Sequence, residues 1–137
     1  MSRSVLDSSA ILALLEKEQG WEKVRAALPD GVVSSLTLAE VVTRLTLRGG
    51  KPWQIAAAWD DLRLVVEPFN EGRARAAGLL VDKTRPLRLS LADRACLALA
   101  RELRIPVVTA DRSWRKVQIA DRSWRKVQIG VEVVLIR

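Results

Sequence analysis

Two patterns of hydrophobic and polar positions alternate along this chain. Short runs of consecutive apolar residues, rich in valine, are separated by longer stretches in which apolar residues recur every three or four positions. The short runs are typical of strands covered on both faces, and the longer stretches are typical of helices with one apolar side. The runs predict strands over residues 4–7, 31–35, 62–69, 105–111 and 131–137. The stretches predict helices over residues 8–18, 21–28, 36–50, 52–62, 70–83 and 90–104.

The helix boundaries carry residues that favour a start or a stop. Gly49 and Gly50 end one predicted helix, Pro52 opens the next in its favoured first position, and Ser90 caps the last one. Because helices separate the strands, we expect parallel pairing through right-handed crossovers. The sequence therefore predicts a three-layer α/β fold, and its 137 residues fit a single domain over 1–137.

Composition narrows the class of protein. Lysine and arginine number 23 against 16 acidic residues, and the net charge of +7 favours an anionic partner, with solubility alone as the alternative. The N-terminus lacks the apolar core of a signal peptide, and no apolar run is long enough to span a membrane. The single cysteine, Cys96, forms no internal disulfide and lies among apolar residues that predict burial. We therefore expect a cytoplasmic protein with no membrane partner.

Histidine and tyrosine are absent from the chain. Their absence excludes a histidine general base, a Ser-His-Asp triad, a histidine-ligated zinc site and a tyrosine nucleophile. Catalysis by this chain would have to use carboxylates, hydroxyls, lysines or the lone cysteine.

Four acidic residues occupy similar places in the predicted fold. Asp7 and Asp111 end strands, while Glu40 and Asp93 lie in the first turns of predicted helices. Ligands of open parallel sheets bind at the carboxyl ends of the strands. If the strands concerned are neighbours, the four carboxylates converge at one edge of the sheet.

Helix capping is the alternative role for each acid taken singly. Asp7 precedes a helix, Glu40 completes a capping box with Thr37, and Asp93 completes one with Ser90. A shared location at one edge favours a joint role instead. Clustered carboxylates raise one another's pKa or bind a cation, and an all-oxygen ligand set favours Mg²⁺, with Mn²⁺ as a possible substitute. Such an ion activates water without histidine, so the acids and the basic composition together predict phosphodiester hydrolysis.

Four segments resemble the PIN-domain ribonuclease toxins of the VapC type. They are VLDSSAILALL, SSLTLAEVVTRL, LSLADRACLALA and VVTADRSW, in this order. The resemblance covers essentially the whole chain apart from a repeated block, and it implies a parallel five-stranded sheet between helices. It also implies a Mg²⁺-dependent endoribonuclease of a type II toxin–antitoxin system, acting on structured RNA such as a tRNA. The implied partners are a VapB-type antitoxin and a second copy of the chain in a homodimer.

The resemblance also implies roles for the four acids. Asp7 and Asp93 match the principal metal ligands, and Glu40 matches the acid that helps hold the metal or its waters. Asp111 matches the fourth acid of the site. Hydroxyl residues that orient these acids in the family are matched by Ser8 and Thr109.

The repeated block departs from the family pattern. Residues 110–119 (ADRSWRKVQI) recur unchanged at 120–129, and a recent duplication, an engineered insert and a sequence error all remain open as explanations. Asp111 follows the apolar run IPVVT, whereas Asp121 follows VQIA, a poorer strand, so we assign Asp111 to the site and keep Asp121 as the alternative. The alternative function is a catalytically impaired PIN-fold protein that only binds antitoxin or nucleic acid. A deoxyribonuclease that uses the same ion is a third possibility.

Two further surfaces are expected to contact partners. Arg85 and Arg88 flank the helix that holds Asp93, and they are our preferred phosphate-binding residues among the basic residues of the second half of the chain. Trp53 and Trp59 lie near an apolar helix face and are candidates for a dimer or antitoxin groove.

Overall fold

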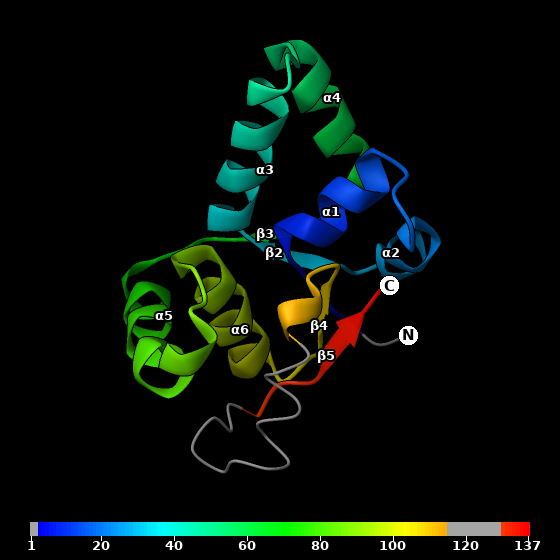
Figure 1. The fold of residues 1–137 in the computed structure, drawn as a ribbon. Coiled ribbons are helices and arrows are strands. Elements are labelled where there is room, and N and C mark those ends of the chain that lie inside the picture. Colours follow the sequence, from blue (N-terminus) through cyan, green and yellow to red (C-terminus); the bar gives the residue numbers. More distant parts are fainter. Residues whose placement is uncertain (1–2, 115–129) are drawn as a thin grey trace.

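Five short strands form one parallel sheet. A computed structural model describes residues 3–114 and 130–137 of the chain, and in it the strand order is β3-β2-β1-β4-β5 (Figure 1). Every pairing within this sheet is parallel. The strands are β1 (Val5–Leu6), β2 (Val32–Ser34), β3 (Val65–Glu67), β4 (Val107–Thr109) and β5 (Val133–Leu135). The predicted α/β fold with a parallel five-stranded sheet is confirmed.

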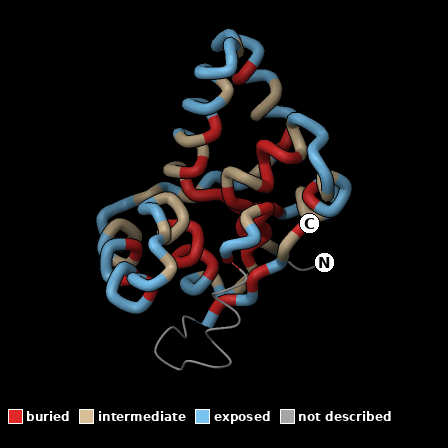
Figure 2. The backbone as a smooth tube through the Cα atoms, in the orientation of Figure 1, coloured by how far each residue is buried: buried red, intermediate tan, exposed pale blue. Residues whose placement is uncertain are grey.

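Successive residues of the central strands face two separate hydrophobic cores. Val5 and Val107 pack in one core, and Leu6 and Val108, the next residue of each strand, pack in the other. This follows from the pleat, which points successive side chains to opposite faces. Helices α5 and α6 cover one face and α1 and α2 the other (Figure 1), so the fold has three layers, with the buried residues concentrated at its centre (Figure 2). The helices are α1 (Ser8–Leu15), α2 (Trp21–Ala27), α3 (Ser35–Leu47), α4 (Pro52–Leu62), α5 (Glu71–Thr84) and α6 (Leu91–Leu103), with short 3₁₀ turns η1 (Arg85–Leu87) and η2 (Arg112–Trp114). No helix in the described ranges has the length and apolar character needed to cross a bilayer.

Helices α3 and α4 form a hairpin, called the arm below, that projects from the rest of the fold (Figure 1). The side chain of Ser34 caps the start of α3, and Gly49 turns the chain towards α4 with a φ of +93° that favours glycine. Ile55 is one of only two buried residues in α4. Trp53, at the tip of the arm, is 70% exposed. The arm therefore presents apolar side chains that the rest of the described chain leaves uncovered.

The edge strand β3 differs from the prediction. The run predicted over residues 62–69 contains a strand of only three residues. Val65 and Val66 are 46% and 38% exposed. Because β3 lies at the edge of the sheet, it pairs with β2 alone. The expectation that helices cover both faces is wrong for this strand and holds for the central ones.

Candidate active site

Asp7 is a buried carboxylate at the end of β1. It is 4% exposed and also caps the N-terminus of α1, where its Oδ1 accepts a hydrogen bond from the backbone N–H of Ala10 at 3.0 Å. The hydroxyl of Ser9 donates to Oδ1 at 2.8 Å, and the hydroxyl of Thr109 donates to Oδ2 at 2.9 Å. Residues of α1 and the last residue of β4 thus fix the orientation of this carboxylate.

The surroundings of Asp7 disfavour its negative charge. Burial raises its pKa to about 7, more than the hydrogen bonds from Ala10, Ser9 and Thr109 lower it, and the charge of Asp93 raises it further. Within the described residues no lysine or arginine forms an ion pair with Asp7. A charged Asp7 therefore lacks a compensating cation from the described chain.

Asp93 lies in the first turn of α6 and is half-buried. It forms the predicted capping box: its backbone N–H donates to Ser90 Oγ at 3.1 Å, and its Oδ2 accepts from the backbone N–H of Ser90 at 3.0 Å. Its pKa is raised, chiefly by burial and further by the charges of Asp111 and Glu40, against the lowering effect of the hydrogen bonds with Ser90. Asp93 thus interacts electrostatically with each of the other three acids.

Glu40 reaches the same region from the middle of α3. Its carboxylate accepts a hydrogen bond from the hydroxyl of Ser8, the first residue of α1. The predicted capping box with Thr37 is wrong, because Ser34 caps α3 one turn earlier and places Thr37 inside the helix. The buried Thr37 hydroxyl instead contacts Cys96 Sγ at 3.2 Å.

Cys96 lies beneath the acids. Burial raises the pKa of its thiol, and the charges of Asp7, Asp93 and Glu40 raise that pKa further. Its predicted burial is confirmed.

Asp111 lies just beyond β4 and is partly buried. Its Oδ1 accepts hydrogen bonds from the backbone N–H and the hydroxyl of Ser113, which start the 3₁₀ turn η2. Its own backbone N–H donates to the hydroxyl of Thr109, the residue that binds Asp7. The predicted local capping role of Asp111 is therefore present, together with its proximity to the other acids. The alternative candidate, Asp121, lies outside the described residues.

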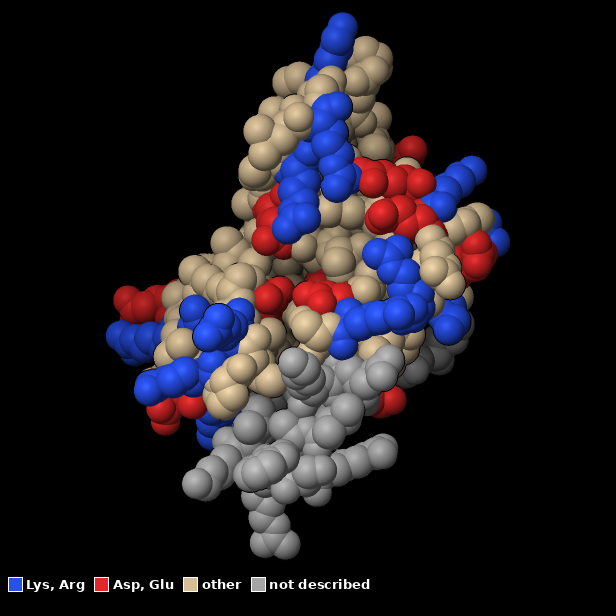
Figure 3. Space-filling model, in the orientation of Figure 1, with Lys and Arg blue, Asp and Glu red and all other residues tan. Residues whose placement is uncertain are grey.

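The four acids belong to one region of the surface. Figure 3 shows acidic atoms in the middle of one face, between the arm and the α5–α6 pair, with basic side chains on the flanking elements. Electrostatic effects link Asp93 to Asp7, Glu40 and Asp111. The convergence predicted from the sequence is therefore found at the level of charge interactions.

The donor chemistry of this region fits a hard divalent cation. All four acids offer oxygen ligands, and the described chain compensates none of them with an ion pair. The spacing of these ligands does not yet form a metal site. Within residues 3–114 and 130–137, no group of three or more potential ligands is arranged closely enough to hold a metal ion. Hydroxyls and helix caps hold the carboxylates in these positions.

Ser9 is a residue of this region that the sequence prediction missed. Its hydroxyl donates to Asp7, lies 3.2 Å from the Thr109 hydroxyl, and accepts a hydrogen bond from the backbone N–H of Ala110 at 2.9 Å. The available signal was the Ser-Ser pair directly after Asp7. Ser8 and Thr109, which were predicted to orient acids, contact Glu40 and Asp7 respectively.

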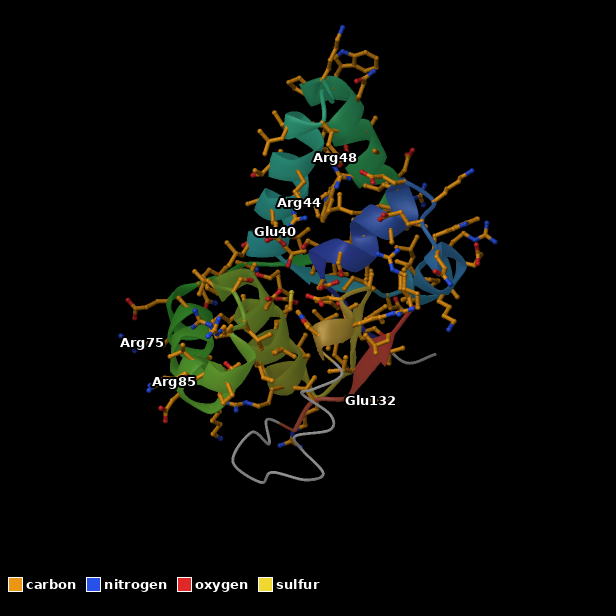
Figure 4. The ribbon with its side chains drawn as sticks, viewed as in Figure 1. Glu40, Arg44, Arg48, Arg75, Arg85 and Glu132 are labelled. Carbon is orange, nitrogen blue, oxygen red and sulfur yellow. The ribbon has the colours of Figure 1, made fainter. Side chains whose placement is uncertain are left out.

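The predicted partner-binding residues lie at different distances from the acids. Arg85 forms a surface ion pair with Asp82, and Figure 4 places it on the far side of the α5–α6 pair. Arg88 is exposed and follows η1. Trp59 lines a pocket of about 360 Å³ between the helices of the arm.

Comparison with known proteins places this fold in a family. A sequence model of the PIN domain matches residues 4–120, and no curated protein matches significantly. The fold is similar to "VapBC2 from Rickettsia felis bound to a DNA fragment from their promoter", with a TM-score of 0.69, 15% identity, and coverage of 95% of this chain and 96% of that one. It is also similar to VapBC-5 from Mycobacterium tuberculosis, with a TM-score of 0.64, 20% identity and coverage of 98% and 99%. A toxin–antitoxin complex from Klebsiella pneumoniae gives a TM-score of 0.64, 18% identity and coverage of 81% and 89%. Because the matching model spans most of its length, the chain belongs to the PIN domain family, a family of nucleases.

Proposed function

We propose that this chain is a Mg²⁺-dependent endoribonuclease and the toxin of a type II toxin–antitoxin system. The observation that carries the proposal is Asp7, which is buried, has a pKa raised to about 7, and lies within electrostatic reach of Asp93. A buried carboxylate without a compensating cation lowers the stability of a fold, and groups of this kind are concentrated at functional sites. A divalent cation would supply the missing compensation.

In this proposal Asp7, Glu40, Asp93 and Asp111 hold the ion, with Mn²⁺ as a substitute for Mg²⁺. When bound, the ion polarises a phosphate and lowers the pKa of a coordinated water. One oxygen each of Glu40, Asp93 and Asp111 has no hydrogen-bond partner among the described residues, because their recorded hydrogen bonds all use the other oxygen. Each of these acids could therefore keep its anchoring contact while it offers the second oxygen to a cation.

The hydroxyl residues would act as positioning residues. Ser9 and Thr109 fix the Asp7 carboxylate between the ends of β1 and β4, and Ser8 fixes Glu40 against α1. Such outer contacts hold ligands in one orientation and so strengthen metal binding.

The proposed protein partner is a VapB-type antitoxin. The similar structures described above include a toxin–antitoxin complex and VapBC proteins of toxin–antitoxin systems. On this chain the arm offers the apolar pocket lined by Leu38, Val42, Ile55 and Trp59, which suits the apolar face of a partner segment. The proposal has three further parts. The chain forms a homodimer, its substrate is structured RNA (a tRNA in particular), and it acts in the cytoplasm.

The test is RNA cleavage. Purified protein is incubated with total RNA in Mg²⁺ or in EDTA, beside Asp7→Asn and the control Asp61→Asn, which changes an exposed aspartate of α4. We expect cleavage that requires Mg²⁺, is lost in the Asp7 variant and is retained in the control. Cleavage that persists in EDTA or in Asp7→Asn would contradict the proposed site.

A catalytically impaired PIN-fold protein is the second candidate. The observation that favours it is the lack, within the described ranges, of three potential ligands close enough to hold an ion. Folded wild-type protein that binds RNA or an antitoxin but cleaves neither RNA nor DNA in Mg²⁺ or Mn²⁺ would support this second candidate.

A further inference from the structure

Helix α3 and its C-cap residue Arg48 carry two stripes of different chemistry whose members are exposed or partly exposed. Leu38 and Val42 belong to an apolar stripe that lines the pocket of the arm. Glu40, Arg44 and Arg48 form a second stripe with the same four-residue spacing, offset from the first by two positions. Two positions correspond to about 200° around a helix, so the stripes lie on nearly opposite sides of α3. Figure 4 shows Glu40, Arg44 and Arg48 following one another along the helix from the acid region towards the tip of the arm.

Arg44 lacks the ion pair that its position favours. A glutamate four residues before an arginine commonly pairs with it on a helix. Here the Glu40 carboxylate is bonded to the hydroxyl of Ser8, and no ion pair joins Arg44 to a carboxylate in the described part of the chain. An exposed guanidinium is thus left one helical turn from an acid of the candidate site.

Arg48 lies one turn further along the stripe, about 6 Å along the helix axis. It pairs with Glu16 at the end of α1, and the two side chains remain 50% and 33% exposed. Exposed pairs of this kind contribute little to stability, so a phosphate can take the place of Glu16 at low cost. Arg48 is therefore also available to an anionic ligand.

We propose that Arg44 and Arg48 bind phosphates of the RNA strand whose scissile phosphate lies at the acids, so that the strand runs along α3. This inference rests on the proposed nuclease function. The planar guanidinium of arginine binds phosphate oxygens through paired hydrogen bonds. The RNA backbone and the uncompensated acids are both negative and repel each other. The two positive charges of Arg44 and Arg48 offset this repulsion.

Other arginines fit this role less well. Arg75 pairs with Glu71 inside α5. Arg85, which the sequence alone favoured as a phosphate-binding residue, pairs with Asp82, so the structure favours the α3 stripe over it. Figure 4 places both away from the α3 stripe. They therefore provide a matched control, because their removal changes the net charge by the same amount as removal of Arg44 and Arg48.

The test measures how salt weakens RNA binding. Three proteins are prepared in an Asp7→Asn background that prevents cleavage: the parent, Arg44→Ala with Arg48→Ala, and Arg75→Ala with Arg85→Ala. The probe is a fluorescein-labelled 20-nucleotide single-stranded RNA of mixed sequence, and binding is measured by fluorescence anisotropy at several salt concentrations. Each phosphate contact with single-stranded RNA contributes about 0.7 to the slope of log K against log salt. We expect the α3 double variant, Arg44→Ala with Arg48→Ala, to lose about 1.4 of this slope. The control, Arg75→Ala with Arg85→Ala, should keep the parent slope. Arg44→Lys with Arg48→Lys should keep the parent slope, because this variant keeps both charges.

Three results would overturn the inference. Equal losses in the two double variants would mean that net charge alone matters, and an unchanged slope in the α3 variant would place the RNA elsewhere. Loss of binding to a polyglutamate peptide without loss of RNA binding would assign the stripe to an acidic protein. Cleavage of total RNA is measured in parallel with protein that keeps Asp7. A protein that cleaves RNA but shows no role of Arg44 and Arg48 in binding would overturn this inference alone, whereas a protein that does not cleave RNA would contradict the nuclease function.

Discussion

The buried carboxyl group of Asp7 should make the metal-free protein less stable as the pH rises. In the folded chain Asp7 keeps its proton up to about pH 7, whereas its usual pKa is 3.8. Between these values the folded state binds more protons than the unfolded state, so the free energy of unfolding falls as the pH rises through this window. Above pH 7 the folded protein carries a buried charge that no ion pair among the described residues compensates.

The size of this effect follows from the shift. A rise in the pKa of Asp7 from 3.8 to about 7 corresponds to on the order of 4 kcal/mol of lost stability at pH 8. Asp7→Asn removes the charge and keeps the shape, and the hydroxyls of Ser9 and Thr109 can rotate to accept from the new amide. The variant should therefore gain stability over the wild type at pH 8 and differ little from it at pH 5.

Urea unfolding in EDTA at pH 5, 6, 7 and 8 checks this prediction. The difference between wild type and Asp7→Asn isolates one carboxyl group from the other titrating groups, and the exposed Asp61→Asn serves as the control. Addition of Mg²⁺ should stabilise the wild type at pH 8 and leave the Asp7 variant unchanged, since a ligand stabilises only the state that binds it. If the difference in free energy of unfolding between the wild type and Asp7→Asn were the same at every pH from 5 to 8, the reasoning would be refuted.

Three further changes have defined outcomes. Ser9→Ala removes a hydrogen bond to Asp7, so the Mg²⁺ concentration for half-maximal RNA cleavage should rise by about tenfold or more, as measured by Mg²⁺ titration; an unchanged midpoint would exclude the positioning role. Ser90→Ala removes the cap of α6 and should cost about 1 kcal/mol in urea unfolding, whereas no loss would mean that the capping box is not formed in solution. Asp111→Asn should abolish cleavage and Asp121→Asn should not, and the reverse result in the same RNA assay would move the site to the second copy of the repeat.

Local patterns along the chain were sufficient to predict the fold class but not the order of the strands in the sheet. Valine-rich runs predict the central strands because these strands are covered on both faces, and the stop signal at Gly49 and the cap at Ser90 are confirmed. All five strands are shorter than the runs that predict them, and the edge strand β3 in addition has exposed valines, which an apolar run does not reveal. Pairing with neighbours, which decides where a strand ends, is not a local property of the sequence.

The sequence named the four acids of the candidate site but not the contacts that the structure gives them. The capping box of Glu40 with Thr37 matched the sequence pattern, yet α3 starts earlier, because Ser34 both ends the paired strand β2 and caps the helix. The partner of Glu40 is Ser8, which is 32 positions away and on another helix. The exposed charge of Arg44 depends on that distant contact, so no local rule identified the α3 stripe.

The structure also bears on which copy of the repeated block belongs to the site. Asp111 follows β4, where Val108 is 4% exposed and Thr109 is fully buried and donates to Asp7. If Asp121 took the place of Asp111, Gln118 and Ile119 would occupy the positions of these two residues. A buried glutamine amide without partners costs about 1–3 kcal/mol, and isoleucine has no hydroxyl for Asp7. Because the two copies are identical, excision of either one gives the same shorter chain, and that chain retains the segment VVTADRSW, which includes Thr109 and Ser113, the residues that contact Asp111. The physical argument therefore favours Asp111 as the acid of the site, whatever the origin of the second copy.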